Sequence, residues 1–252
     1  MVAMQTESRT ILTAADEHTE KRFLAINRDR LLRVQGSLTP RQRDFLDILA
    51  LLFHINHPLL PGYVSKETPA GINDYSPNET TMRAARRMWR AFDHDRRPPA
   101  RYAVRGLYMM GSPGTIAYTR HSDLDMWLCH DPALPETAVE QLAEKARRIE
   151  RFAEEIGLEV HFFVFDAERF RRGDMLSLSA ESSGSSQHSL LLDEFYRSSL
   201  LVAGLPPMWW RVPSRYEHDY DAYVAEGIAA RTIDPRDYID FGGLPGIPVE
   251  EF

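Results

Sequence analysis

The sequence predicts a mixed α/β fold of the α+β type, with a helical N-terminal region followed by a small mixed sheet flanked by helices. Apolar residues recur at helical spacing up to about residue 92. From about residue 103, short apolar runs alternate with longer amphipathic ones, which is typical of strands and helices in turn. The character changes at Arg96-Arg97-Pro98-Pro99. We therefore expect a helical region over 1–98, a sheet-containing core over 99–214, and the start of a further helical region over 215–252.

Three helices are predicted in the first region. Residues 1–18 are polar and weakly patterned, so a frayed start is expected, and the first helix is predicted over 20–36. Thr39 followed by Pro40 predicts an N-cap with proline at the first helical position. That second helix should end before the proline-containing segment 57–63, and a third helix is predicted over 78–92.

The second region should contain the sheet. Strands are predicted over 103–110, 124–129, 158–165 and 208–212. A long amphipathic helix is predicted over 136–156, where Gly157 provides a C-cap. A Ser/Gly-rich loop over 177–187 should lead into a helix over 188–203 that ends at Gly204.

Composition excludes several classes of protein. Of the 252 residues, 43% are hydrophobic and 27% are charged, which suits a folded domain with a substantial core. No apolar run approaches the roughly 20 residues that span a bilayer, and no apolar signal segment opens the chain. The single cysteine, Cys129, permits no internal disulfide, so a cytoplasmic protein is the simplest interpretation. The net charge of −7 argues against nucleic-acid binding through a broad basic surface.

The most informative segment pairs a Gly-Ser turn with two aspartates. Gly111-Ser112 follows the first predicted strand, and Asp123 and Asp125 flank the start of the second. Strand alternation places both carboxylates on one face, about 6–7 Å apart. Such a pair is tolerated when a divalent cation lies between its members. Oxygen ligands favour Mg²⁺, which completes its octahedron with phosphate oxygens that a Gly-Ser turn can hold.

A third carboxylate follows at Glu159, between apolar neighbours on a predicted strand. An acidic residue there is unexpected unless it faces a site. Asp166 is the alternative third ligand, although it could equally cap the next helix. His161 shares a strand face with Glu159 and could line the site or be structural. Three carboxylates from two strands beside a Gly-Ser turn are typical of a two-metal phosphoryl-transfer centre.

Each of these features is common by itself, and their order is what carries information. Gly-Ser, then an Asp-x-Asp strand, then a lone acidic residue on a later strand resembles the nucleotidyltransferase superfamily shared with polymerase beta. This resemblance implies a polymerase-beta-like nucleotidyltransferase domain over 99–214.

Longer motifs resemble a narrower family, the class I adenylate cyclases of gammaproteobacteria. The segments that carry this resemblance are YMMGS at 108–112, SDLDMWLCH at 122–130, GLEV at 157–160 with Phe162-Phe163, GSSQHSLLLDEFYR at 184–197, HPLLPGY at 57–63 and DFGGL at 240–244. They extend from about residue 20 to the end of the chain. One departure is the loop after Gly-Ser, where enterobacterial relatives carry several serines and this chain has Pro113, Gly114 and Thr115.

The resemblance implies conversion of ATP into 3′,5′-cyclic AMP and pyrophosphate, with two Mg²⁺ ions, or Mn²⁺ in their place. Asp123 and Asp125 would hold both ions, Glu159 would hold one and accept the proton of the attacking 3′-hydroxyl, and Gly111 and Ser112 would hold phosphates. Family members are longer, so the implied partner besides ATP is the regulatory portion of the full enzyme. Two alternatives stay open: transfer of AMP to a separate acceptor, and an ATP-binding fragment that is inactive by itself.

Gln187 and His188 are further candidates for nucleotide binding. They follow the Ser/Gly-rich loop and open a predicted helix, whose N-terminus could receive a phosphate group. An ordinary helix N-terminal region explains them equally well.

Overall fold

A computed structural model describes residues 2–92, 101–115, 118–119, 122–174 and 185–244. Its α-helices are α1 (Val2–Ser37), α2 (Pro40–His54), α3 (Glu79–Met88), α4 (Glu136–Glu155), α5 (Ala167–Arg171), α6 (Ser185–Ser198) and α7 (Tyr220–Ala229). Its strands are β1 (Val104–Met110), β2 (Leu124–His130), β3 (Val160–Phe165) and β4 (Leu200–Gly204). Short 3₁₀ helices are η1 (Ser112–Gly114), η2 (Met208–Arg211), η3 (Ser214–Asp219) and η4 (Pro235–Asp237).

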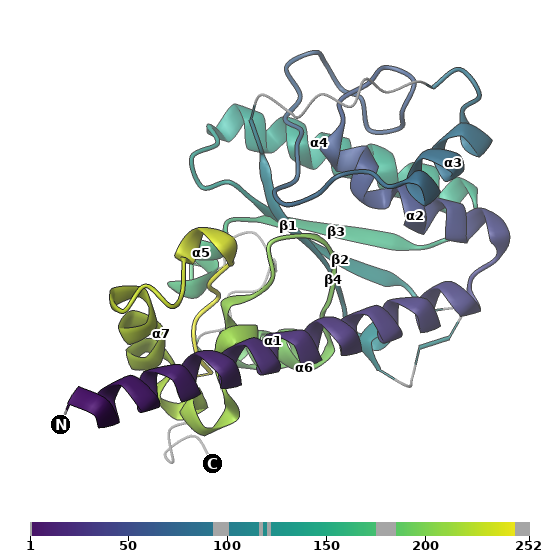
Figure 1. Cartoon of the computed structure of the whole chain (residues 1–252). Helices are drawn as coiled ribbons and strands as arrows, with labels where there is room; N and C mark the ends of the chain where they lie inside the picture. The colour runs from purple at the N-terminus through teal and green to yellow at the C-terminus, as the bar shows by residue number, and fades with distance from the viewer. Residues whose placement is uncertain (1, 93–100, 116–117, 120–121, 175–184, 245–252) are drawn as a thin grey trace.

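The four strands form one mixed sheet in the order β3-β2-β1-β4. Strand β1 is antiparallel to both β2 and β4, and β2 is parallel to β3. Figure 1 shows α2, α3 and α4 on one side of the strands and α1, α5, α6 and α7 on the other. The predicted mixed α/β architecture is therefore confirmed.

Strand alternation divides β2 between two cores. Leu124, Met126 and Leu128 are fully buried in a cluster that also contains residues of α2, α3 and α4. Trp127 and Cys129 point to the opposite face and pack with α5, α6 and the C-terminal Phe241. Because Asp125 has the same parity as Trp127, it lies on the α6 face of the sheet.

The helical N-terminal region shares its core with the sheet. The cluster that contains Phe45 and Phe53 of α2 also contains Val104 and Leu107 of β1. The predicted N-cap at Thr39 is confirmed, and Thr39 and Gln42 together form a capping box at the start of α2, while Asn78 caps α3. The division of the chain near residue 98 stays a prediction, since the boundary lies outside the described residues.

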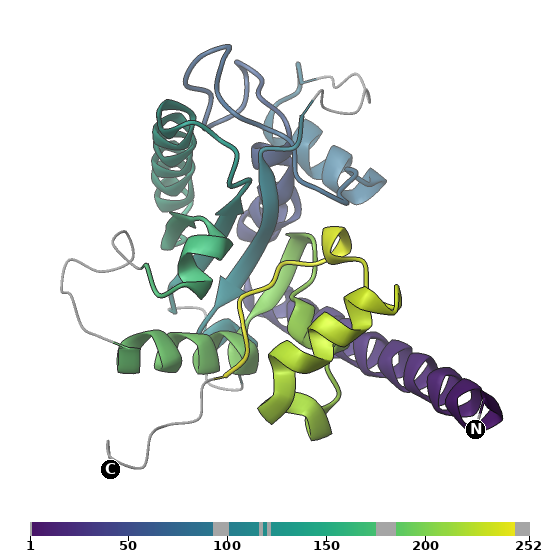
Figure 2. The same cartoon turned by 90° about the vertical axis from the view of Figure 1, so that its left-hand side faces the viewer.

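Helix α1 begins earlier than the sequence indicated. The expected frayed start is wrong, because the helix runs from Val2 and its first half projects from the body of the fold (Figure 2). Alanine, methionine, glutamine and glutamate in this stretch have high helix propensity, which sustains a helix without an apolar pattern.

Two predicted elements are wrong. The helix predicted over 188–203 ends at Ser198, and Leu200–Gly204 form β4 instead. This apolar run suits either element, and pairing with β1 selects the strand. Residues 208–211 form the 3₁₀ helix η2 rather than a strand, directly after Pro206 and Pro207. No helix in the described part of the chain has the length and apolar character of a membrane span.

Candidate active site

Several of the predicted site residues lie at one end of the sheet, where β1 ends and the parallel strands β2 and β3 begin. Met110, the last residue of β1, is the cross-strand partner of Asp125. On the other side, Asp125 is paired with His161 of β3. The Leu124 N–H donates to the Glu159 carbonyl oxygen at 3.0 Å, which places Glu159 beside the start of β2. Four of the predicted residues therefore lie at the same end of the sheet: Gly111, Asp123, Asp125 and Glu159.

Asp125 is partly buried and Asp123 is exposed. The pKa of Asp125 is raised, first by its burial and then by the negative charges of Asp123, Glu194 and Glu159, while His161 opposes the shift. Among the described residues no lysine or arginine forms an ion pair with Asp123 or Asp125. Within the described residues, no lysine or arginine neutralises the charge that accumulates at this end of the sheet, and His161 opposes it in part.

Glu159 lies immediately before β3, which is an edge strand of the sheet. The Glu159 side chain is 70% exposed, and its Oε1 is 3.2 Å from Nε2 of His161. This edge position gives a second reason for an acidic residue there, because an edge-strand side chain can face water. Asp166, the alternative third ligand, caps α5 by accepting from the Glu168 N–H at 2.8 Å.

The Gly111-Ser112 turn links β1 to η1. Gly111 has φ +73° and ψ −137°, a conformation that residues with a side chain rarely adopt. The backbone conformation, and not a lack of space, requires glycine at this position. A Cβ there would have only Glu194 Oε1 nearby, at an ordinary contact distance of 3.9 Å. The Gly111 N–H donates to Ser198 Oγ at 3.2 Å, so this amide already has a partner in α6.

The remaining predicted nucleotide-binding residues lie at the far end of α6. Gln187 is in the first turn of the helix, and its side chain lies outside the described residues. The His188 ring is 4.7 Å from that of Phe170, its buried Nδ1 has no hydrogen-bond partner among the described residues, and burial lowers its pKa. Ten residues of helix, about 15 Å, separate His188 from Ser198 at the Gly111 turn.

Glu194 and Ser198 also lie beside the Gly111 turn, and neither was predicted from the sequence. Both lie on the last turns of α6, four residues apart and hence on one helix face. A signal was present in the sequence, because Arg197 follows Asp193 by four residues and Glu194 by three, so a single arginine faces two adjacent carboxylates. The Arg197 Nε donates to both oxygens of Asp193 at 2.8 Å.

The arrangement suits a cation that shares its coordination with a ligand. Among the described residues no group of three or more His, Cys, Asp or Glu side chains is placed to hold a metal by itself. Mg²⁺ does not require such a cage, because it is held by one or two carboxylates together with substrate phosphates and water. Carboxylate oxygens beside an open glycine turn provide this donor set.

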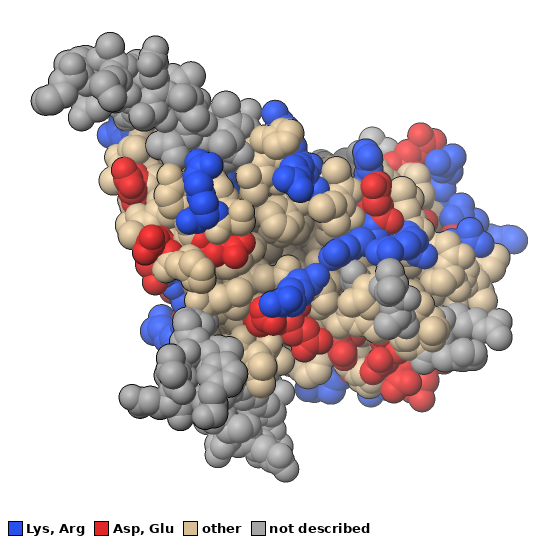
Figure 3. Space-filling view, turned by 90° about the horizontal axis from the view of Figure 1, so that it is seen from below, with Lys and Arg blue, Asp and Glu red and all other residues tan. Residues whose placement is uncertain are grey.

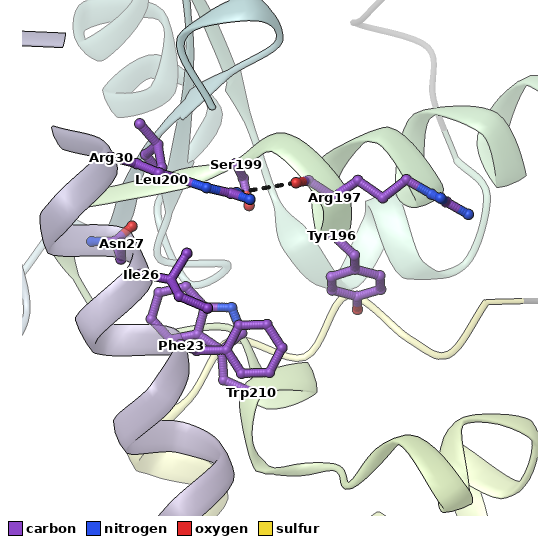
Figure 4. Close-up of a pocket in the computed structure, with 9 residues that line it drawn as sticks. All are labelled: Phe23, Ile26, Asn27, Arg30, Tyr196, Arg197, Ser199, Leu200 and Trp210. Carbon is purple, nitrogen blue, oxygen red and sulfur yellow. Dashed lines mark hydrogen bonds between the residues drawn. The ribbon is translucent and has the colours of Figure 1, made fainter. Parts of the chain in front are cut away.

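Cavities on the α1 side of the molecule are separate from this edge. One of about 120 Å³ lies between α1, the end of α6 and η2, where Phe23 lies over Trp210 and Arg30 donates to the Arg197 carbonyl (Figure 4). A neighbouring cavity between α1 and η3 has about 270 Å³. Both are smaller than the roughly 300–1,000 Å³ of small-molecule sites. Figure 3 shows basic and acidic side chains interspersed on this face.

Comparison with known proteins shows that most of the chain is similar to one group of proteins. A sequence-family profile described as the adenylate cyclase NT domain matches residues 16–210. The adenylate cyclases of Salmonella typhimurium (strain LT2) and Escherichia coli (strain K12) are each 36% identical to this chain over 238 residues. The alignment covers 94% of this chain and 28% of each relative, so the chain corresponds to a little over a quarter of their length.

Two solved structures have a weaker similarity. A crystal structure of a toxin–antitoxin with AMP-PNP is 15% identical to this chain and has a TM-score of 0.24. The match covers 51% of this chain and 75% of that chain. A mutant of the toxin–antitoxin MntA-HpeT is 15% identical with a TM-score of 0.25, and covers 51% of this chain and 84% of its own.

Proposed function

Because the chain belongs to the family of adenylate cyclase N-terminal domains, we propose that it forms the nucleotide- and metal-binding part of an enzyme that converts ATP into 3′,5′-cyclic AMP and pyrophosphate. The observation that carries this proposal is the group of carboxylates around Asp125 at the end of the sheet where β2 and β3 begin. There, Asp123, Asp125 and Glu159 accompany an open Gly111 turn, and no lysine or arginine of the described residues forms an ion pair with the two aspartates.

The proposed cations are two Mg²⁺ ions, with Mn²⁺ able to replace them. Asp123 and Asp125 would hold both ions from the start of β2, and Glu159, the residue before β3, would supply a third carboxylate to one of them. Bound there, the ions would offset the charge of the phosphates and lower the pKa of the attacking hydroxyl. The raised pKa of Asp125 supports this assignment, since a cation would relieve the repulsion that causes part of the shift.

Other groups of the protein would bind the phosphates and accept the proton of the attacking hydroxyl. The Gly111-Ser112 turn would receive the phosphates through the Ser112 hydroxyl and backbone amides other than that of Gly111. Glu159, exposed beside His161, would accept the proton of the 3′-hydroxyl as that oxygen bonds to the α-phosphorus and pyrophosphate leaves. Transfer of AMP to a separate acceptor would use the same carboxylates, so the placement of the ribose decides between the two reactions.

A second candidate function is binding of Mg·ATP without turnover by this chain alone. The observation that favours it is coverage, because the chain spans 28% of its cyclase relatives. The rest of the active surface would then come from residues that those relatives have beyond the aligned part.

The test is incubation of the purified chain with Mg²⁺ and ATP, measuring cyclic AMP formation and ATP binding separately. Asp123→Asn and Asp125→Asn are the test variants. Asp237→Asn is the matched control, because this exposed aspartate lies far from the candidate site. Its neighbour Tyr238 accepts a hydrogen bond from Arg105 at the other end of β1. Five residues of strand, about 17 Å, separate Arg105 from Met110 at the site.

Cyclic AMP that is lost in both test variants and kept in the control would show a complete cyclase site. Mg²⁺-dependent ATP binding without product, lost by roughly tenfold or more in the test variants, would identify the binding part of a longer enzyme. AMP found on an acceptor would indicate the transferase reaction. A chain that binds neither Mg²⁺ nor ATP would contradict the proposal.

A further inference from the structure

A hydroxyl group of α6 is bonded to the Gly111 turn. Ser198 Oγ accepts from the Gly111 N–H at 3.2 Å and donates to the Glu194 carbonyl oxygen at 2.8 Å. Because the bond to Glu194 uses the hydroxyl hydrogen, the Ser198 oxygen faces the Gly111 amide as an acceptor. Ser198 is only 5% exposed, so water competes little for either bond. The turn and the helix are therefore joined at a buried point.

This hydrogen bond continues the pairing of β1 with β4. Met109 is the cross-strand partner of Leu200, and the same antiparallel register, continued along both chains, places Gly111 opposite Ser198. The backbone groups of Leu201 point away from β1, to α1, so those of Leu200 point toward β1. Hydrogen-bonded pairs recur at every second residue of such a ladder, so the Gly111 N–H would next donate to a strand carbonyl. Ser198 belongs to α6 instead, and its side chain supplies that acceptor.

Glycine at position 111 makes the turn depend on this bond. The φ of +73° and ψ of −137° are accessible to glycine because of its wide conformational freedom, which also lets the chain turn easily there. On the side where a Cβ would lie, the described residues leave open space, since the nearest atom is Glu194 Oε1 at 3.9 Å. Packing on that side therefore does not hold the turn. The bond to Ser198 restricts the rotation of Gly111 and so fixes where Ser112 lies.

Ser112 is the residue of the turn that is best suited to bind a phosphate. The Gly111 amide is already used by Ser198, Pro113 has no N–H, and the Thr115 N–H donates to the Ser112 carbonyl oxygen at 2.9 Å. Ser112 is at the first position of η1, where an amide has no partner within its own helix. Its N–H and hydroxyl can therefore face a ligand, and their direction depends on Ser198 through Gly111.

We propose that Ser198 is a positioning residue for the proposed reaction: its hydroxyl takes the place of a strand carbonyl at the end of β1 and fixes the Gly111-Ser112 turn in the orientation that receives the phosphates. This inference rests on the proposed function, since it concerns the orientation of the same turn. Misplacement of a binding group by about 1 Å is enough to impair a site. The Ser198 hydroxyl therefore affects phosphate binding although it contacts no phosphate itself.

The test measures the affinity of the purified chain for a non-hydrolysable ATP analogue in the presence of Mg²⁺. Ser198→Ala removes the hydroxyl, Ser198→Cys fills its space with a weak acceptor, and Ser198→Thr keeps the hydroxyl. Ser199→Ala is the matched control, because it removes a hydroxyl one residue away, at the cavity beside α1. Thermal unfolding verifies that each variant folds, and hydrogen exchange of the Gly111 amide measures the protection that the bond gives.

Ser198→Ala and Ser198→Cys are expected to weaken binding of the analogue roughly three- to tenfold and to speed exchange of the Gly111 amide hydrogen. Ser198→Thr and Ser199→Ala should bind like the unaltered chain. The cysteine variant decides if the alanine variant does not fold. Unchanged affinity without the hydroxyl, or an equal loss in Ser198→Thr, would overturn the role of Ser198 and leave the proposed function standing. An unaltered chain that does not bind the analogue would overturn both.

Discussion

Asp125 is partly buried, and three other carboxylates act on it with their negative charge. Burial and the charges of Asp123, Glu194 and Glu159 all favour its protonated form. Its pKa is raised in the folded chain relative to the unfolded one, so ionisation of Asp125 favours unfolding. The protonated Asp125 carboxyl therefore contributes fully to stability below the pKa of the unfolded chain. This contribution is lost as the pH rises through the pKa of Asp125 in the folded chain. At neutral pH, therefore, this residue lowers the stability of the fold.

Asp125→Asn is accordingly predicted to stabilise the chain while removing cation binding. At about pH 7 the free energy of unfolding should rise by roughly 0.5–2 kcal/mol, the range for optimised surface charge. The gain should shrink as the pH falls toward about 4, where the native carboxyl protonates. Thermal unfolding at both pH values measures this. Asp193→Asn should give no gain, because Asp193 is paired with Arg197. An Asp125→Asn variant less stable than the unaltered chain at pH 7 would contradict the argument.

At the scale of elements, β4 is an edge strand whose outer side is covered by a helix. Asn27 of α1 donates its Nδ2–H to the Leu201 carbonyl at 2.9 Å and accepts the Leu201 N–H with Oδ1 at 2.7 Å. One side-chain amide thus makes both hydrogen bonds that a further strand would make to Leu201. Edge strands without such cover are sites of unwanted pairing between chains.

Asn27→Ala is predicted to destabilise the chain by about 2 kcal/mol or more, because both backbone groups of Leu201 lose their partner. For a chain of this size each kcal/mol corresponds to about 2–4 °C in the melting temperature. The neighbouring Arg28→Ala, whose side chain is 76% exposed, should change it little. Equal melting temperatures for the two variants would show that the Asn27 amide does not support β4.

At the scale of the whole molecule, α1 connects parts of the chain that are far apart in sequence. Beyond the Asn27 contact, Phe23 stacks on Trp210 with ring centroids 5.6 Å apart. Glu20 Oε2 accepts from Arg211 at 3.2 Å and from the Tyr238 hydroxyl at 3.0 Å. The Arg211 side chain is only 9% exposed, so Glu20 neutralises a nearly buried cation.

Glu20→Gln is predicted to destabilise the chain by about 2–3 kcal/mol, below the roughly 3–5 kcal/mol for a fully buried pair because Glu20 keeps some exposure. Chemical denaturation measures the change. Glu155→Gln, an exposed position at the end of α4, is the control and should stay within about 0.5 kcal/mol of the unaltered chain. A Glu20→Gln variant as stable as this control would mean that Arg211 finds another partner.

Local sequence was sufficient for much of this architecture. Strands β1, β2 and β3, helix α4 with its C-terminal Gly157, the cap at Thr39 and the start of a helix near Asn78 were predicted from spacing and from single residues. Alternation along a strand placed Asp123 and Asp125 on one face. Long motifs indicated the adenylate cyclase family, because a match of that length rarely arises by chance. These are properties of neighbouring residues, which a sequence displays directly.

Contacts between distant residues decided the rest. The run Leu200–Gly204 became a strand because β1 offered it hydrogen bonds, and nothing within the run distinguishes that outcome from a helix. Glu194 reached the candidate site because Phe195 packs on Trp127 and Ser198 bonds to Gly111, which lies 87 residues away in sequence. Spacing determines which side chains share a face, whereas only packing determines what that face meets. The sequence by itself thus determined the family and the acidic pair, and the tertiary structure decided which other carboxylates accompany it.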